Sequence, residues 1–524
     1  MKKLLHLLIL FTLMSGTALG QMHSPTTYLD ILKGLSGKLK LELSYSPDLV
    51  ALNENTTTQF SANADSCITE LEKTANLRIT QTDTHLIVAS KAPAYIRLQG
   101  KVVDAKTGEL LPYANILIGK AGAGTITNTE GAFDFKIQGR FAGSLIRFSF
   151  LGYKSQQLFI PYASDSSIVV KMIPKPYLLS DVYVLPNGTA AVDIVKRAVK
   201  NIKRNYARTT TQMEAFYRNT NYRDTIASQI IEAALLIQDR GINTQPSTTR
   251  IQVEELRKSN SYLVPQSKKE KLAFALMDKM FGGHRNILYR AYANSVRYYR
   301  MSWWYKPLTD YETFKYEFAG FEWLDSVKVY KIKFIYDKLQ PDGKRASENK
   351  NSEDGGYIYV SSKDWGVLKM ERWWKVLNDR FLTNMVIKDN YIWRTETGYP
   401  KISGKYYLKY KTGFATPNGT SAVYENPDAP KKERKIKERQ WAEYVLLVTK
   451  VITDKKEMDK IRYREKLARD EHTYEAKYPY HPTFWETYNI LKENPVQEKF
   501  IKEMEWEKSL DIQFKENSSN YANN

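Results

Sequence analysis

The sequence predicts a multi-domain protein that is mainly β with α+β parts. We expect a small α/β module, a seven-stranded-type β-sandwich, and a large antiparallel β domain with helices. The chain has 524 residues, which exceeds one compact core and suffices for several domains. Aromatic residues make up 13% of the chain and include 36 Tyr, and aromatic side chains suit half-buried pleated surfaces. Short alternating apolar runs between Gly, Asp and Pro turns indicate the same fold class.

Composition excludes several classes of protein. With 42% hydrophobic and 26% charged residues, the chain is neither wholly disordered nor a polytopic membrane protein. Cys67 is the single cysteine, so no intrachain disulfide can form, and we expect this residue to be buried. The net charge of +20 favours anionic partners, whose identity depends on the compartment.

The N-terminus predicts the compartment. Lys2 and Lys3 precede an apolar stretch, and Ala18-Leu19-Gly20 offers small residues at the positions that a signal peptidase reads. We expect cleavage after Gly20 and export; an uncleaved anchor is the alternative. Nucleic acid is then not an expected partner, and acidic lipid headgroups, anionic glycans or a partner protein would account for the basic charge.

The first two modules differ in their patterns. Residues 24–92 show the order helix, strand, helix, hairpin, with Leu29, Leu32 and Leu35 at helical spacing. Residues 96–173 show short strands separated by Gly and Asp turns, which is typical of a β-sandwich.

A linker and an amphipathic helix follow the second module. Prolines mark 174–190 as the linker, and Val192, Val195, Val199 and Ile202 share one face of the helix. Lys and Arg side chains ring the rest of this helix, and we interpret them as a solvated face rather than a lipid-binding one.

The large β domain is predicted from alternation. Tyr406, Leu408 and Tyr410 alternate with Lys405, Lys409 and Lys411, and 330–336 shows the same pattern. Both runs predict strands with one buried and one wet face. Residues 256–300 look helical, and the polar stretch 340–355 predicts a mobile loop.

The expected domains follow from these patterns. We divide the chain into a signal peptide 1–20, a small module 24–92, a sandwich 96–173, a linker 174–190, an amphipathic helix 191–210, a large antiparallel β domain with a helical insert 211–452, a basic helical region 453–514 and a disordered tail 515–524.

Two segments resemble known families. Residues 24–92 resemble the secretin and TonB short N-terminal domain. The segments 41–50 and 77–80 carry this likeness. Gly100–Asp104, 108–115, 127–133 and 148–153 follow in the order of the carboxypeptidase-like regulatory domain, a transthyretin-like β-sandwich. That family commonly begins the periplasmic extension of TonB-dependent outer-membrane receptors. No plug domain or long series of barrel strands follows here, so the resemblance does not imply transport.

The remainder resembles other proteins of this kind from Gram-negative outer membranes. Phe216-Tyr217-Arg218 and 484–491 carry that likeness, and the strand pattern around 356–371 is similar to lipoprotein-carrier half-barrels.

The sequence contains few of the residue motifs that are typical of catalytic sites. His472 and Glu475 fit HxxE with His481 nearby, but a catalytic zinc needs a third protein ligand, and only a short tail follows. There is no GxSxG, and Gly119–Gly124 is a hairpin turn without the Lys-Ser/Thr of a phosphate loop. We therefore expect no catalytic residue, no cofactor and no metal.

These observations predict a non-enzymatic periplasmic accessory or scaffold protein, peripherally associated with the outer membrane and with an outer-membrane protein complex. The outer-membrane process would be protein assembly, signalling or nutrient uptake. The alternatives are a peptidase or glycan hydrolase, and a glycan-binding protein. We expect a hydrophobic, extended, lipid or glycan ligand in an aromatic groove of the large domain. The expected groove residues are Tyr330, Phe334, Tyr357, Tyr359, Tyr406, Tyr410, Trp303 and Trp373, with Ile332 beside them.

Overall fold

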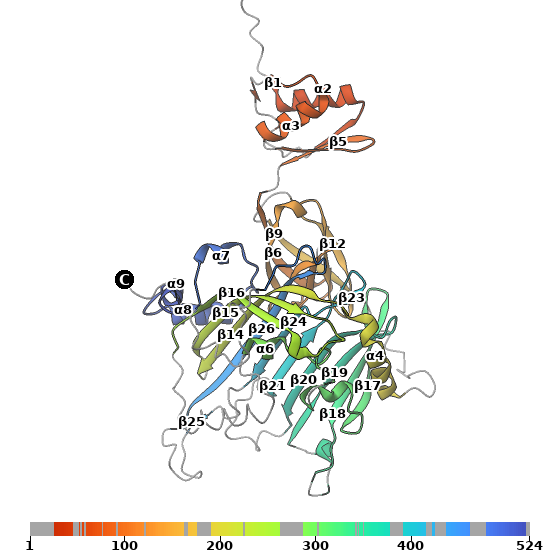
Figure 1. Cartoon of the computed structure of the whole chain (residues 1–524), viewed down its shortest axis with the longest axis vertical. Helices are drawn as coiled ribbons and strands as arrows, with labels where there is room; N and C mark the ends of the chain where they lie inside the picture. Colours follow the sequence, from red (N-terminus) through yellow and green to blue (C-terminus); the bar gives the residue numbers. More distant parts are fainter. Residues whose placement is uncertain are drawn as a thin grey trace, which may run out of the picture. The chain divides into compact units, whose positions relative to one another are not determined.

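The structure is a computed structural model whose described residues form two compact units. The first unit comprises the described parts of Met1–Ile96, Ile137–Gly143 and Pro161–Asp165, and the rest belongs to the second (Figure 1). The predicted signal peptide, most of the linker, and His472 with Glu475 lie outside the described residues. The described residues are 26–45, 52, 55–56, 59–75, 77–90, 93–119, 122–161, 166–175, 190–223, 226–261, 287–300, 303–340, 343, 345–348, 351–377, 391–415, 422–424, 436–461 and 478–519.

The small α/β module has the predicted order of elements. A capping box between Thr27 and Asp30 starts the first helix, and Asn63 caps the second through a 3.1 Å hydrogen bond from the Ser66 amide. Strand β5 pairs parallel with β2 and antiparallel with β4, and Cys67 is buried as predicted. The elements are β1 (Thr26–Thr27), α2 (Tyr28–Leu39), β2 (Glu42–Tyr45), β3 (Asn55–Thr56), α3 (Ala64–Thr74), β4 (Leu77–Gln81) and β5 (His85–Ser90).

The second module is a β-sandwich, as predicted. Strand β7 pairs with β8 and β10, and β10 with β12, while β6 pairs with β13. Phe133, Phe135 and Phe148 are almost fully buried in it. Its elements are β6 (Tyr95–Asp104), β7 (Asn115–Ile118), β8 (Ala123–Ile126), β9 (Ala132–Gln138), η3 (Gly139–Phe141), β10 (Leu145–Ser149), β11 (Tyr153–Lys154), β12 (Gln156–Phe159) and β13 (Ser166–Pro174).

A tight turn before β9 shows why glycine is required there. Gly131 has a φ of 60°, and its amide donates to the Asn128 carbonyl at 3.1 Å. A Cβ on Gly131 would lie 2.7 Å from the Val102 carbonyl oxygen, so any other residue would be both strained and crowded.

One antiparallel sheet dominates the second unit. Its strand order is β16-β15-β14-β26-β24-β21-β20-β19-β18-β17. The bounds are β14 (Thr211–Arg223), β15 (Ile226–Asp239), β16 (Arg250–Lys258), β17 (Phe314–Leu324), β18 (Val327–Tyr336), β19 (Ser352–Ser361), β20 (Val367–Val376), β21 (Tyr391–Gly398), β24 (Tyr410–Ala415) and β26 (Ile436–Ile452); β22 (Lys401–Ile402) and β23 (Lys405–Tyr406) form a hairpin, and β25 (Ala422–Tyr424) pairs with β26.

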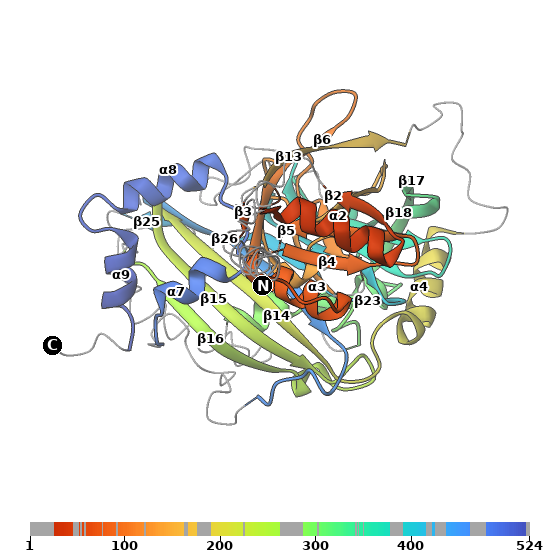
Figure 2. The same ribbon diagram turned by 90° about the horizontal axis from the view of Figure 1, so that it is seen from above.

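The helices of the second unit cover both faces of this sheet (Figures 1 and 2). We call the face that carries Phe334 and Leu446 the inner face; it packs against α4, α6 and η5. The face that carries Phe216 and Tyr410 is the outer face, over which α7, α8 and α9 lie. The bounds are α4 (Ala191–Asn205), η4 (Pro246–Thr248), α6 (Ile287–Tyr292), η5 (Trp303–Leu308), η6 (Ala346–Glu348), α7 (Pro482–Thr487), α8 (Pro495–Met504) and α9 (Leu510–Glu516). None of the described helices has the length and apolar character needed to cross a membrane.

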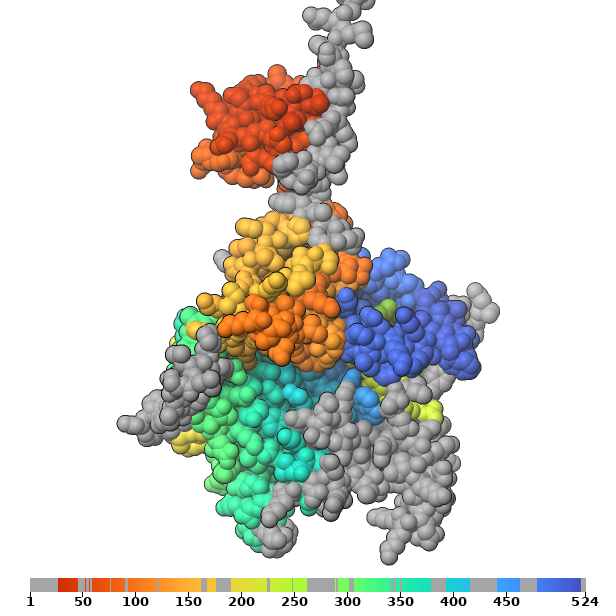
Figure 3. All heavy atoms as spheres, turned by 180° about the vertical axis from the view of Figure 1, so that it is seen from behind, coloured from red at the N-terminus to blue at the C-terminus, as the bar shows by residue number. Residues whose placement is uncertain are grey.

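The sandwich contacts both the large sheet and the C-terminal segment, and β8 also pairs with β26 at Ala123 and Lys450. Asp325, in the β17–β18 turn, accepts a 2.8 Å hydrogen bond from the Ser155 amide, and its carbonyl accepts one from the Lys175 ammonium at 3.0 Å. The Asn489 side chain exchanges two 2.8 Å hydrogen bonds with the backbone of Lys136. Figure 3 shows the blue C-terminal residues lying against the orange sandwich.

The run from Lys405 to Lys411 was wrongly predicted as one strand with a wet face. Residues 407–409 lie between β23 and β24, and Lys409 and Lys411 are 2% and 9% exposed. Alternation failed because both faces of the sheet are covered here.

Other predicted boundaries also need correction. Residues 256–258 end strand β16, and the described residues 293–300 follow α6 without helical structure, so 256–300 is not one continuous helix. Helix α4 ends at Asn205 rather than at 210, and β19 already begins at Ser352 inside the predicted loop. Helix α9 continues to Glu516, beyond the predicted start of the disordered tail.

Candidate functional site

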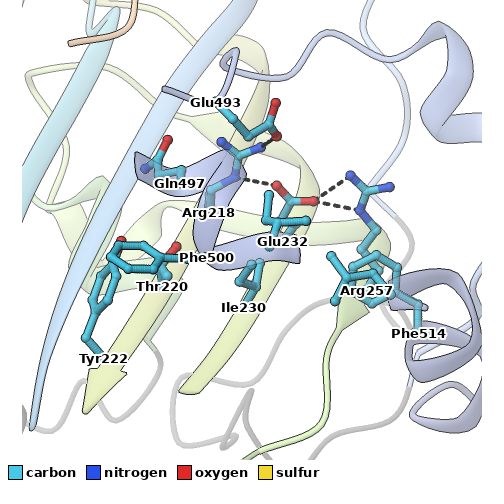
Figure 4. Close-up of a pocket in the computed structure, with 12 residues that line it drawn as sticks. Arg218, Thr220, Tyr222, Ile230, Glu232, Arg257, Glu493, Gln497, Phe500 and Phe514 are labelled. Atoms are coloured by element: carbon cyan, nitrogen blue, oxygen red, sulfur yellow. Dashed lines mark hydrogen bonds and ion pairs between the residues drawn. The ribbon is translucent and has the colours of Figure 1, made fainter. Parts of the chain in front are cut away.

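A cavity of about 200 Å³ lies between the outer face and the C-terminal helices (Figure 4). Strands β14, β15 and β16 supply its floor, and α8, α9 and the residues before α8 supply its roof. The lining residues are Arg218, Thr220, Tyr222, Ile230, Glu232, Arg257, Glu493, Gln497, Phe500, Ile501, Leu510 and Phe514.

The floor carries a buried ionic network. Glu232, on β15, lies between two arginines: one carboxylate oxygen accepts from Arg218, and the other accepts from the Arg257 Nε at 2.6 Å. Arg218 also contacts the Glu493 carboxylate and donates to the Leu491 carbonyl at 3.0 Å. Two cations and two anions make the network neutral, and Figure 4 shows Glu232 between the two guanidinium groups.

Burial opposes the charged forms of these groups, but their neighbours outweigh it. Burial alone would lower the pKa of Arg218, yet Glu232 and Glu493 raise this pKa above its ordinary value. Burial alone would raise the pKa of Glu232, yet Arg218 and Arg257 lower it. Glu232 is therefore held ionised at neutral pH.

Aromatic side chains fix the position of the network. The Arg257 guanidinium lies 4.2 Å from the ring centroid of Trp485 and 5.1 Å from that of Phe514. At the other end of the cavity, the rings of Tyr222 and Trp441 stack with centroids 3.9 Å apart. The cavity thus has a floor on strands and a roof on short helices.

This arrangement suits binding rather than proton transfer. Glu232 already accepts from both guanidinium groups, and its lowered pKa makes it a poor proton acceptor. Ile230, Ile501 and Leu510 supply an apolar lining. The volume is below the roughly 300–1,000 Å³ of pockets for drug-sized ligands. It fits the end of an apolar chain or one large side chain.

A second ionic cluster lies on the outer face where β20 pairs with β21. Glu371 lies directly opposite Glu396, and the Lys369 ammonium is 3.1 Å from a carboxylate oxygen of each. The hydroxyls of Tyr359 and Tyr410 donate to Glu371 and Glu396 at 2.9 and 2.7 Å.

Two facing carboxylates are the groups that a glycan hydrolase uses, with one carrying a proton to the leaving group. Burial would raise the pKa of Glu371, but Lys369 and Arg394 outweigh burial and lower it. A carboxylate with a lowered pKa is a poor general acid, so this cluster does not favour the hydrolase alternative.

Lys409 is a buried amine that does not line the cavity. Its ammonium donates to the Val448 carbonyl at 2.7 Å, and burial lowers its pKa to about 7. This combination of burial and a single neutral acceptor explains the shift.

The β18–β19 register divides the predicted groove residues between the two faces. Tyr330 and Phe334 point to the inner face, where Phe334 is fully buried, and Tyr406 packs into the same core. Tyr357 and Tyr359 stand opposite Lys333 and Lys331, on the outer face. These residues therefore do not line one surface.

Trp373 and Tyr410 also belong to the outer face. Trp373 is 5% exposed, its Nε1 donates to a Glu353 oxygen at 3.2 Å, and its ring meets that of Tyr357 edge-on at 5.1 Å. Tyr410 stacks on Tyr113 of the sandwich. Trp373 thus offers no flat exposed ring to a sugar, and the side chain of Trp303 lies outside the described atoms.

His472 and Glu475 of the zinc motif lie outside the described residues. His481, which is described, contacts a carboxylate oxygen of Glu255 through Nδ1. Among the described residues, no group of three or more His, Cys, Asp or Glu side chains is placed to hold a metal ion.

The sequence reasoning missed the cavity, although a signal was present. Glu232 is an isolated charge in the apolar run 230–236, and Arg218 follows Phe216 and Tyr217 in β14. A lone charge inside a buried strand needs a partner, because an unpaired buried charge is costly. That requirement would have linked Arg218 with Glu232.

Comparison with known proteins supports part of the predicted organisation. Residues 98–184 match the CarboxypepD_reg-like domain family, which confirms the resemblance of the sandwich. A search of curated proteins returns no match. The likeness of the small N-terminal module to the secretin and TonB short N-terminal domain stays a prediction.

Solved structures show only distant likeness. A LolA superfamily protein from Nitrosomonas europaea is 8% identical, with 51% of this chain and 94% of that chain covered and a TM-score of 0.20. A DUF1329 family protein from Desulfovibrio piger is 11% identical over 51% of this chain and 95% of that chain, with a TM-score of 0.21. The Pseudomonas aeruginosa MucA/MucB complex is 9% identical over 49% and 93%, with a TM-score of 0.15. At these scores the likeness says nothing about function.

Proposed function

We propose that this chain is an exported, non-enzymatic accessory protein of the Gram-negative envelope, associated with the outer membrane. Its large β domain binds an apolar group, the end of a chain or a large side chain, between the outer face and helices α8 and α9. The two N-terminal modules hold partners in an outer-membrane complex, and the small module acts as a secretin/TonB-type domain.

The observation that carries this proposal is the cavity of Figure 4. Its floor carries a neutral network in which both Glu232 oxygens accept hydrogen bonds, and Ile230, Ile501, Leu510 and the Phe500 and Phe514 rings add apolar surface beside Thr220 and Gln497. An apolar ligand would gain free energy by leaving water, at about 25 cal/mol per Å² of buried apolar surface. It would not need to displace any ion pair.

The hydrogen bonds between the sandwich and the rest of the second unit support the scaffold part of the proposal. Hydrogen bonds at Asp325 and Lys136 join the sandwich to the sheet and to the C-terminal segment that roofs the cavity. A partner that binds the sandwich would therefore be linked through these contacts to the segment that roofs the cavity.

The test uses the neutral fluorescent probe N-phenyl-1-naphthylamine with the mature full-length chain. We expect saturable binding with increased fluorescence. Ile501→Trp should fill the cavity and weaken probe binding by about ten-fold or more, because every 1.4 kcal/mol changes a dissociation constant ten-fold.

Ile512→Trp is the matched control, since Ile512 lies on α9 and is 45% exposed. It should leave probe binding unchanged. Equal loss in both variants, or unaltered binding in Ile501→Trp, would contradict the assignment of the cavity as the binding site.

The open aromatic groove stays a prediction in a narrower form. In the outer-face row of Tyr357, Tyr359 and Trp373, the last two are each 5% exposed and Tyr357 is half-buried, so we propose Tyr357 as the row's contact with an apolar ligand. Tyr357→Ala tests it in the same probe assay, and an unchanged affinity would remove the row from the site.

A further inference from the structure

Helix α4 has a strongly divided surface. Ile194, Val195 and Ile202 are almost fully buried in the inner-face core. The opposite side carries basic residues, and the helix has five Lys and Arg side chains against the single acid Asp193. Asp193 lies in the first turn, so the later turns present positive charge alone.

The cations toward the end of this helix are exposed. Lys200, Lys203 and Arg204 all point to solvent, and Arg208 follows in the same chain segment. Within the described part of the chain, Lys200, Lys203 and Arg208 have no acidic partner. Cations that form no internal ion pair are available to an external anion.

A groove of about 420 Å³ begins where α4 ends. It is formed by four chain segments, and Lys405 connects it to the helix because its ammonium donates to the Arg204 carbonyl. The lining residues are Ala207, Arg208, Thr209, Thr211, Asn243, Lys405, Tyr407 and Thr453.

The walls of this groove are held in place. The Ile242 amide donates to the Ala207 carbonyl at 2.8 Å, and Tyr206 forms a β-bridge with Tyr406. Gly241 has a φ of 93°, and a Cβ there would lie 2.6 Å from the Arg208 carbonyl carbon. The backbone around Arg208 is therefore closely packed against the 241–243 loop.

The groove combines the groups that bind a phosphate ester. The Arg208 guanidinium can donate to two phosphate oxygens, Lys405 adds a point charge, and the Thr209 hydroxyl adds a donor. Tyr407 and Ala207 supply apolar contacts that a free inorganic ion would not use. This pairing of cations with apolar surface is complementary to the headgroup region of an anionic lipid.

Aromatic rings flank the same helix. The Arg197 guanidinium lies 5.0 Å from the ring centroid of Trp365, and the Lys196 ammonium lies 5.4 Å from that of Tyr311. Both rings are half-buried. Half-buried Trp and Tyr beside Lys and Arg are typical of surfaces that lie at the membrane–water interface.

We propose that the basic side of α4 and the adjoining groove dock the protein on an anionic lipid surface, with a lipid phosphate held by Arg208 and Lys405. This deepens the proposed function by naming the membrane-facing surface, but it does not depend on the Figure 4 cavity. It also revises our interpretation of the α4 cations as a purely solvated face.

The experiment is co-sedimentation of the mature chain with vesicles of phosphatidylglycerol and phosphatidylcholine, or of phosphatidylcholine alone. We expect binding to the anionic vesicles only, and weaker binding as salt rises, since salt screens exposed charges. Arg204→Glu with Arg208→Glu should weaken binding by about ten-fold or more. Lys101→Glu with Lys171→Glu, on exposed strand positions of the sandwich, makes the same change in net charge and should have little effect.

Several outcomes would overturn the proposal. The first is equal binding of the chain to both vesicle types, and the second is an equal loss of vesicle binding in the two double variants. The third is that inorganic phosphate competes for the surface as strongly as the anionic lipid does. Binding to the acidic glycan heparin with the same dependence on Arg208, without vesicle binding, would assign the surface to a glycan instead. Ile501→Trp should still bind vesicles, so failure of the cavity proposal and failure of this one are distinguishable.

Discussion

The sandwich and the large sheet bury their strands in different ways. In the sandwich, β9 and β10 alternate between buried and more accessible positions. In the large sheet, β14 is buried at nearly every position, because helices pack on both of its faces. A strand covered on both faces shows no alternation, and each charge within it must find its partner inside the protein. Substitution of the buried charges of the large sheet therefore tests whether this sheet depends on internal charge partners in a way that the sandwich does not.

Glu232→Gln should cause the largest change. The substitution leaves the buried Arg218 and the half-buried Arg257 without their shared anion, and removing one partner of a buried ion pair costs about 3–5 kcal/mol. Urea unfolding of the full-length chain would measure the lost stability.

Glu317→Gln is the control for this prediction. Glu317 is 43% exposed and pairs with Lys315 at 2.8 Å, so its loss should change stability by no more than about 1 kcal/mol. A Glu232 variant as mild as this control would show that the network contributes nothing to the fold.

Gly131→Val tests the sandwich, where backbone geometry rather than charge is decisive. Valine at a φ of 60° would be strained, and its Cβ would meet the Val102 carbonyl, so we expect a loss of about 1–3 kcal/mol. The midpoint of thermal unfolding would report it.

Gly108→Val separates the effect of backbone strain at positive φ from the effect of crowding by a neighbouring carbonyl. Gly108 also has a positive φ of 75°, but a Cβ there meets nothing within 4 Å. It should cost less than Gly131→Val, and an equal cost would mean that the close approach to Val102 is unimportant.

The sandwich was predictable because local signals agree with the fold. Its turns need residues of positive φ, and Gly108, Gly131 and Gly152 supply them. Phe133, Phe135 and Ile137 alternate because only one side of β9 faces the core. Both signals are readable from a few consecutive residues.

Lys409→Met should produce a smaller, pH-dependent effect in the large sheet. Burial lowers the pKa of Lys409 from 10.5 to about 7. Between these values the unfolded chain binds a proton that the folded chain does not, so wild-type stability rises with pH across this window. Below pH 7 Lys409 is protonated in both the folded and the unfolded chain, and the free-energy cost of burying its ammonium no longer changes with pH.

The methionine variant lacks this penalty. It should be more stable than the wild type near neutral pH, and the difference should shrink by about 1.4 kcal/mol for each unit of pH increase. A difference that stays constant between neutral and alkaline pH would mean that Lys409 titrates as an ordinary exposed lysine.

The large sheet and its cavity were only partly predictable. Strands such as β18 were correct because Ile332 and Phe334 alternate with lysines. The C-terminal helices that cover the outer face are distant in sequence from β14–β16, and nothing in either segment alone says that they meet. Contact between Arg218 and Glu493 depends on the folded chain, so composition and periodicity could not reveal it.

Native mass spectrometry tests the central claim most directly. The mature chain, exported to a Gram-negative envelope and purified without denaturation, should carry an additional apolar mass. Ile501→Trp should lose this mass, and Ile512→Trp should retain it. An unliganded wild-type chain, or a mass that persists in Ile501→Trp, would contradict the assignment of the cavity beneath α8 and α9 as the ligand site.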